Sequence, residues 1–169
     1  MKSGASSILE KALREFASVA LMTGPCTLDL FVVEHDQFGQ PEVAKLVAAI
    51  QSSSIHVGRI GSRHRLADFV VGRLITTTGH IQILPDIERP DQNLDSQALQ
   101  ILRQAGIRSI LIVPLDDPIT FMVGIATISW PRPTRFAVGE LENLLAGRKR
   151  LSKVVALYLQ EYGVQIPEK

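Results

Sequence analysis

The sequence has one cysteine and no apolar run long enough to cross a membrane. Cys26 alone cannot form an internal disulfide framework or a cysteine-rich zinc site, and we expect a reducing compartment. The longest apolar stretches are Ile110–Val113 and Phe121–Ile128, and Gly124 and Thr127 interrupt the second. Because a spanning helix needs about 20 apolar residues, we expect no membrane association and a cytoplasmic location.

The sequence also lacks an excess of charge of either sign. Lys and Arg total 18, Asp and Glu total 17, and the net charge is +1. This balance argues against a dedicated nucleic-acid-binding protein, because such proteins carry an excess of basic residues. The 169 residues, 46% of them hydrophobic, are enough for a substantial core, and we expect one domain over 1–169.

Apolar spacing and turn residues outline the secondary structure. Apolar residues at three- and four-residue steps predict helices over 8–20, 66–74, 95–104 and 138–162. Runs rich in Val, Ile, Leu and Phe predict strands over 27–34, 81–84, 107–115 and 121–130. Asp116-Asp117-Pro118 predicts a hairpin turn between the last two strands. Residues 43–50 fit either a strand paired with 27–34 or a short helix.

Three segments of the second half follow the pattern of a known family. Ile83-Leu84-Pro85-Asp86 fits the end of that family's third strand, Gly106–Leu115 with its Val-Pro-Leu ending fits the fourth, and Gly124–Ser129 fits the fifth. With Phe136 leading into a long helix, the sequence resembles a GAF domain. The resemblance implies an α+β fold, with a central antiparallel sheet of five to six strands. Terminal helices would cover one face and middle helices the other. A PAS-like or profilin-like fold would show similar strands.

The resemblance implies a sensor or regulatory role rather than one particular ligand. Members of the family bind cyclic nucleotides, bilins, haem or small anions, and others only dimerise. One branch, the free methionine-(R)-sulfoxide reductases, uses several cysteines, whereas this chain has one. The four histidines show no metal-ligand spacing: His35, His56, His64 and His80. We therefore expect no catalytic residues, no metal site and no enzyme activity, and the sequence leaves the cofactor unknown.

A basic stretch from Arg59 to Arg73 suggests where a ligand would bind. Guanidinium groups pair with carboxylate or phosphate, so the stretch fits an anion site, although such runs also occur on solvated surfaces. With the aromatic and imidazole groups nearby, it defines the candidate ligand-binding residues on the sheet face under the middle helices. These are Arg63, His64, Phe69, Arg73, His80 and Asp86.

The first and last helices have more apolar residues than a single core-facing stripe needs. If one stripe covers the sheet, the other faces outward and predicts a homodimer through both helices. The candidate interface residues are Ile8, Ala12, Leu144, Leu151 and Val154. The alternative is a monomer whose own sheet covers the whole wide stripe.

Two functional hypotheses follow. The first is a non-catalytic GAF-like module that binds a small molecule, an anion or a partner signalling protein, and signals through its terminal helices. The second is a dimerisation or scaffold protein with the same fold and no ligand. A cavity with converging polar groups favours the first hypothesis, and a fully packed interior favours the second.

Overall fold

The computed structural model describes residues 4–19, 24–55, 58–78, 80–92, 94–117 and 121–163. Its helices are α1 (Gly4–Val19), α2 (Val70–Thr78), α3 (Ser96–Gln104) and α4 (Val138–Tyr162), with a short 3-10 turn, η1 (Pro90–Gln92). Its strands are β1 (Thr27–His35), β2 (Pro41–Gln51), β3 (Arg63–Arg65), β4 (Gln82–Leu84), β5 (Ser109–Asp117) and β6 (Phe121–Trp130).

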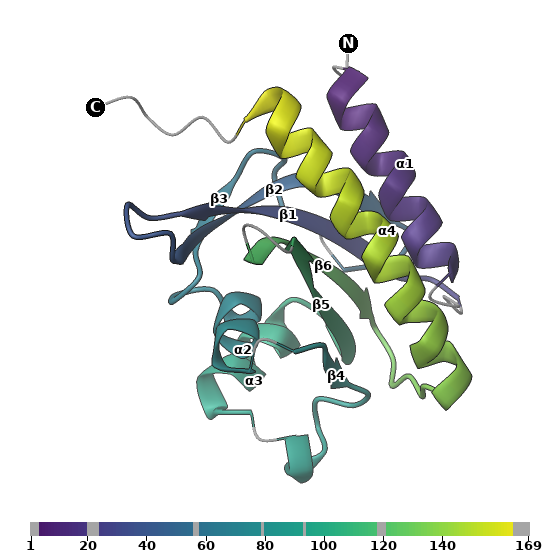
Figure 1. Cartoon of the computed structure of the whole chain (residues 1–169). Helices are drawn as coiled ribbons and strands as arrows, with labels where there is room; N and C mark the ends of the chain where they lie inside the picture. The colour runs from purple at the N-terminus through teal and green to yellow at the C-terminus, as the bar shows by residue number, and fades with distance from the viewer. Residues whose placement is uncertain are drawn as a thin grey trace.

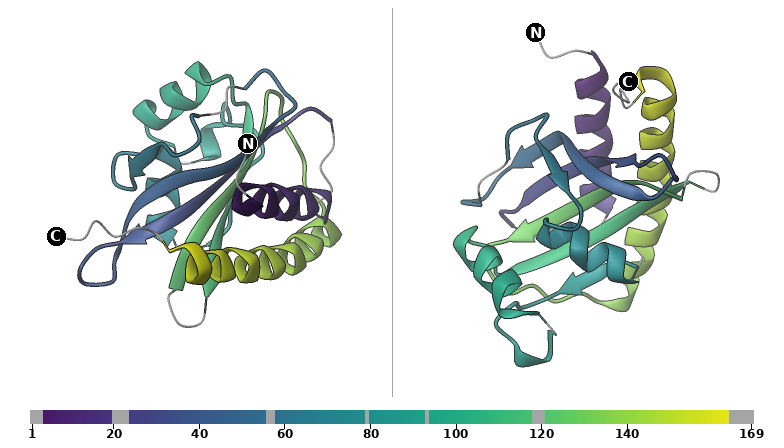
Figure 2. Two further views of the ribbon diagram at one scale, coloured as in Figure 1. Left: turned by 90° about the horizontal axis from the view of Figure 1, so that it is seen from above. Right: turned by 90° about the vertical axis from the view of Figure 1, so that its left-hand side faces the viewer.

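The described strands form one sheet in the order β3-β2-β1-β6-β5-β4, and every neighbouring pair is antiparallel. The terminal helices α1 and α4 lie side by side on one face, and α2 and α3 lie on the other (Figures 1 and 2). The predicted α+β fold with an antiparallel sheet between two helical layers is therefore confirmed. Residues 43–50 belong to a strand, because β2 pairs along the whole of β1.

The central strands are buried on both faces because helices cover both sides of the sheet. On β1, Leu28, Leu30 and Val32 belong to the core shared with α1 and α4. The intervening residues Phe31 and Val33 belong to a second core shared with α2 and α3. A strand between two helical layers needs apolar residues on both sides, which explains the nearly continuous apolar runs in the sequence.

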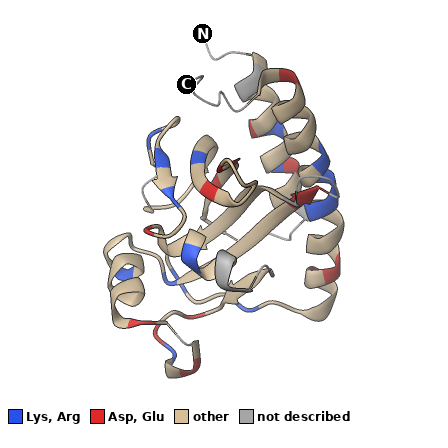
Figure 3. Cartoon of the chain, turned by 60° about the vertical axis from the view of Figure 1, so that its left-hand side comes forward, with Lys and Arg blue, Asp and Glu red and all other residues tan. Residues whose placement is uncertain are grey.

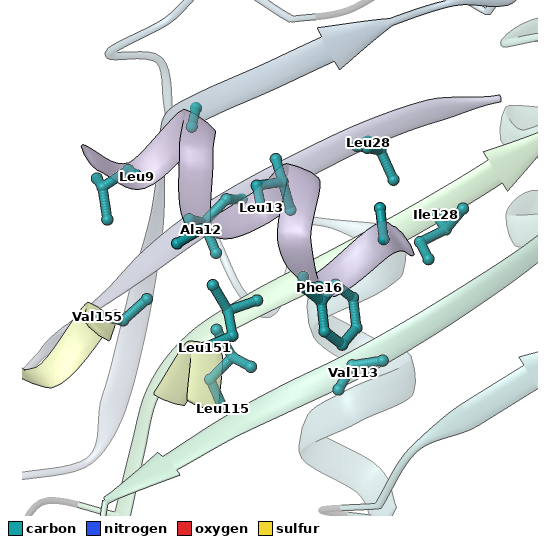
Figure 4. Close-up of a cluster of buried hydrophobic side chains, with 14 of the residues drawn as sticks. Leu9, Ala12, Leu13, Phe16, Leu28, Val113, Leu115, Ile128, Leu151 and Val155 are labelled. Atoms are coloured by element: carbon teal, nitrogen blue, oxygen red, sulfur yellow. The ribbon is translucent and has the colours of Figure 1, made fainter. Parts of the chain in front are cut away.

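The core beneath α1 and α4 is the larger of the two. Leu9, Leu13 and Phe16 of α1 meet Leu151 and Val155 of α4 above the strands (Figure 4). Gly124 of β6 lies tightly against the neighbouring strand. A Cβ atom there would lie only 2.7 Å from the Phe31 carbonyl oxygen of β1, whereas Val155 Cγ1 of α4 would be at an ordinary contact distance of 3.4 Å. The glycine therefore serves the close approach of two backbones.

The predicted hairpin of the last two strands is confirmed, because β5 and β6 pair antiparallel, but two predicted boundaries differ. The turn does not begin at Asp116, because Asp116 and Asp117 continue β5 and pair with Met122 and Phe121 of β6. Pro118 lies outside the described residues. The helix predicted from residue 66 begins instead at Val70, and the polar segment before it contains the short strand β3, which the sequence did not predict.

The prediction that five apolar residues of the terminal helices face outward was also wrong for most of them. Ala12, Leu144 and Leu151 are buried within the chain, with exposed fractions of 8%, 3% and 1%. Val154 is partly buried against the same core, and Ile8 is exposed. The reason is that α1 and α4 pack against each other as well as against the sheet, so each buries two stripes. The exposed apolar residues of α4 are Val138, Leu145, Leu157 and Tyr162.

Replacing Leu151 tests this arrangement. Because Leu151 is fully buried between α1, α4 and the sheet, Leu151→Ala should lower the free energy of unfolding by about 2–5 kcal/mol. Val138→Ala on the same helix, at a 76% exposed position, is the matched control and should change it by no more than about 0.5 kcal/mol. Urea denaturation followed by circular dichroism measures both. Equal effects of the two substitutions would contradict the placement of Leu151.

Candidate functional site

A cavity of about 280 Å³ lies between the sheet and the two middle helices. Its walls come from β1, β2, β3, β5 and β6 on one side and from the segments around α2 and α3 on the other. Most of the lining is apolar, including Phe31, Leu46, Val71, Leu102 and Ile110. The polar lining residues among those described are Asp29, His64, Asp68, Thr127 and Ser129. An apolar cavity with a few polar groups is the usual form of a small-molecule site.

Asp29 is the unusual residue of this cavity. It is the third residue of β1, directly opposite Thr127 of β6, and shares the cavity face with Phe31. The Thr127 hydroxyl hydrogen-bonds its carboxyl group. The other carboxyl oxygen, Oδ1, is buried and accepts no hydrogen bond within the described part of the chain. A buried carboxylate with an unsatisfied oxygen costs free energy unless a ligand, a water or a proton satisfies it.

Burial changes the protonation of this carboxyl group. Removal from water raises the pKa of Asp29 to about 6, and the hydrogen bond from Thr127 opposes the shift without cancelling it. Asp29 therefore gains or loses its proton close to neutral pH. Titratable groups with such shifts inside a cavity are often functional.

Aromatic rings form one wall next to Asp29. His64 of β3 stacks on Phe69 with ring centroids 4.9 Å apart, and Phe69 lies 5.3 Å from Phe31. The His64 Nε2 atom lies 3.2 Å from the Ser62 hydroxyl oxygen, which fixes one edge of the ring. The short strand β3 thus places an imidazole beside two phenyl rings. The resulting surface suits the flat face of a ring-containing ligand.

Of the six candidates named from the sequence, His64 and Phe69 line the cavity. Arg63 forms an ion pair with Glu34, and Arg73 lies 3.7 Å from Asp95. Both arginines lie outside the cavity lining. These two arginines of the basic stretch therefore lie next to separate acidic residues and do not converge on one anion site.

The other two candidates also lie outside the cavity lining. His80 is exposed next to β4. Asp86 accepts hydrogen bonds of 2.5 and 3.1 Å from Arg108. This pairing holds the pKa of Asp86 below its ordinary value. Asp86 therefore joins the end of β4 to the start of β5.

Asp29, Thr127 and Ser129 were not predicted from the sequence. A signal was present for Asp29, because it is the only charged residue between Thr27 and Val33. A charge in the middle of a buried strand indicates either a paired group or a site. Thr127 and Ser129 carried no such signal, since hydroxyl residues are common in strands.

The remaining surface offers two open grooves. One, of about 700 Å³, lies at the β1–β2 hairpin end and includes Glu34, Arg63 and Asp117. The other, of about 590 Å³, follows the outer side of α4 and includes Leu145, Lys149 and Leu157. Helix α1 carries charges of both signs, whereas on α4 the basic residues are grouped between acidic residues near its two ends (Figure 3). In the described ranges, no three His, Cys, Asp or Glu residues are grouped to hold a metal, and no helix is long and apolar enough to cross a bilayer.

Comparison with solved structures identifies the fold. The phycocyanobilin-bound GAF domain of a cyanobacterial phytochrome matches 96% of this chain and 99% of its own length, with a TM-score of 0.65 and 13% identity. The blue-light absorbing form of the PixJ GAF domain from Thermosynechococcus elongatus matches 93% of this chain and 88% of its own, with a TM-score of 0.64 and 15% identity. The chain has the GAF fold.

An enzyme with this fold is also similar. The type II free methionine-R-sulfoxide reductase from Thermoplasma acidophilum has a TM-score of 0.62 and 17% identity, over 90% of this chain and 92% of its own. No family model matches the sequence, and no curated protein is a significant match to it. The GAF fold therefore occurs in light-absorbing proteins and in an enzyme, and the fold alone does not choose between them.

The pH dependence of stability tests the state of Asp29. Its raised pKa means that the folded protein holds an extra proton between about pH 4 and pH 6. The contribution of Asp29 to the free energy of unfolding is therefore greatest at low pH and is lost as the pH rises through about 6. The loss amounts to about 3 kcal/mol at most. Asp29→Asn should thus be more stable than the parent protein at pH 7.5, and the difference should shrink toward pH 4.

The comparison uses urea denaturation at a series of pH values. Subtracting the parent curve from the variant curve removes the contributions of all other titrating groups. Asp68→Asn, at an exposed position of the same cavity, controls for the substitution itself and should change the free energy of unfolding at pH 7.5 by no more than about 0.5 kcal/mol. If the difference in unfolding free energy between Asp29→Asn and the parent protein did not change with pH, the Asp29 carboxyl would be solvated.

Proposed function

We propose that this chain is a non-catalytic sensor or regulatory module that binds a small ligand in the cavity beneath α2 and α3. The single observation that supports the proposal is the Asp29 carboxyl group, which lines an apolar cavity with one buried oxygen unsatisfied by described residues. In a scaffold with no ligand, Asp29 would only reduce stability, because an apolar side chain at this position would avoid the free-energy cost of burying a carboxylate. The GAF fold of light-absorbing proteins supports the same proposal by analogy.

Cys26 gives no support to a catalytic role. It is 1% exposed at the start of the first core strand, and burial raises the pKa of its thiol. The thiolate is the reactive form of cysteine, so a buried thiol with a raised pKa is a poor nucleophile. The likeness to a methionine sulfoxide reductase is a likeness of fold, and the proposal carries none of that enzyme's chemistry to this chain.

The central strands provide the route from the cavity to the terminal helices. On β1, Asp29 and Phe31 face the cavity, while Leu28 and Leu30 pack in the core beneath α1 and α4. On β6, Thr127 faces the cavity in the same way, between residues that pack on the other side. A ligand that shifts these strands therefore also shifts the surface on which α1 and α4 rest, because close-packed cores transmit small displacements.

A ligand screen tests the proposed site. Native mass spectrometry of freshly purified protein should show a retained small molecule, or a panel of metabolites followed by melting temperature should identify a binder. A ligand at one-hundredfold excess over its Kd stabilises the fold by about 2.7 kcal/mol. Ala105→Trp, which fills the exposed edge of the cavity, should abolish the shift, whereas Ala146→Trp on the outside of α4 should not. Binding that survives Ala105→Trp unchanged would place the ligand elsewhere.

The proposed output is a homodimer formed through the terminal helices, which would present them to a partner signalling protein. Ile8, Leu145 and Leu157 are apolar and more than half exposed, and two of them line the groove on α4. We expect a dimer mass by light scattering at micromolar concentration, and a monomer mass for the Leu145→Glu/Leu157→Glu double variant. Val138→Glu, exposed at the start of α4, is the control and should remain dimeric. A monomer mass for the parent protein would contradict the dimer.

A further inference from the structure

The described lining of the cavity includes two carboxyl groups, Asp29 and Asp68, and no lysine or arginine. His64 is the only other titratable group of that lining. The nearby arginines are held elsewhere, since Arg63 pairs with Glu34 and Arg73 lies next to Asp95. An anionic ligand would therefore meet like charge without a guanidinium to compensate it.

The Asp29 carboxyl has hydrogen-bonding capacity that the described residues leave unused. An ionised carboxylate accepts about four hydrogen bonds, and Thr127 supplies one hydrogen bond to this group. Its Oδ1 atom receives none from the described residues. A cationic nitrogen supplies both the missing donor and the missing positive charge. Charge-assisted bonds of this kind are about twice as strong as neutral ones.

The aromatic and apolar lining of the cavity indicates which chemical group would carry this cationic nitrogen. The wall formed by Phe31, His64 and Phe69 is a cluster of rings with centroids 4.9–6.4 Å apart. Such faces bind other rings and attract cations. A cavity of about 150 Å³ is known to hold benzene, so 280 Å³ has room for a ring with a short side chain.

We infer that the cavity selects a small aromatic amine, whose ammonium group pairs with Asp29 and whose ring lies against Phe31 and Phe69. This inference rests on the proposed function, in that it takes the cavity to be the ligand site. It goes further because it assigns a positive charge to the ligand. The basic stretch of the sequence had suggested a negatively charged ligand instead.

Three probes of matched size test the sign of the charge. These are 2-phenylethylamine, 2-phenylethanol and phenylacetate, which place a cation, a neutral hydroxyl or an anion on the same ring. Calorimetric titration of the full chain at pH 7.5 should give the amine at least a tenfold lower Kd than the alcohol, and no measurable binding of phenylacetate. Asp29→Asn should raise the Kd of the amine at least tenfold and leave that of the alcohol unchanged. Glu142→Gln, which removes one exposed negative charge from α4 away from the cavity, is the control and should change the amine's Kd less than threefold.

The pH dependence of binding tests whether the Asp29 carboxylate is the group that pairs with the amine. Affinity for the amine should rise about tenfold from pH 5 to pH 7, as Asp29 with its pKa of about 6 loses its proton. His64→Phe keeps a ring in the stack and should retain this rise, whereas Asp29→Asn should remove it.

The outcomes distinguish the inference from the proposed function. Binding of the alcohol or phenylacetate as tightly as the amine, blocked by Ala105→Trp, would overturn the inference and leave the cavity as the ligand site. Absence of binding by all three probes at 10 mM would also overturn the inference, and the ligand screen above would then decide the proposed function separately. Circular dichroism of each variant confirms that a lost signal does not come from unfolding.

Discussion

Burial of the sheet on both faces is the constraint on which the rest of the structure depends. The strands β1, β5 and β6 lie between two helical layers, so successive residues enter two different cores. A polar side chain in such a strand must find a partner or bear the cost of desolvation. Thr27 does so, because its hydroxyl bonds to Ser53 and to the carbonyl of Ile55. Asp29, two residues further on, is only partly satisfied, and that difference is the physical basis of the candidate site.

Several features were predictable from the sequence because they depend on local pattern. The two last strands and the long C-terminal helix follow from their apolar spacing, and β4 from its position before Pro85. The short strand β3 was not predictable in this way, since Arg63, His64 and Arg65 have no apolar alternation. It forms because the edge of β2 offers unpaired backbone groups, which is a property of the folded sheet.

The candidate site was only partly predictable, for a similar reason. The basic stretch looked like an anion site because its acidic partners are distant in the sequence. Glu34 lies 29 residues before Arg63, and such a pairing becomes visible only in the fold. The error over Leu144 and Leu151 has the same origin: the sequence shows how wide an apolar stripe is, but not how many neighbours cover it.

The two faces of the sheet therefore differ in what holds them together. On one face, α1 with 16 residues and α4 with 25 residues share a continuous core with the strands. On the other, α2 and α3 have nine residues each, shorter than the length at which isolated helices are stable in water. They depend on contacts with the sheet, and the cavity removes part of those contacts. A ligand in the cavity would complete this second core. Because β1 and β6 belong to both cores, ordering the weaker face would act directly on the strands that support the terminal helices.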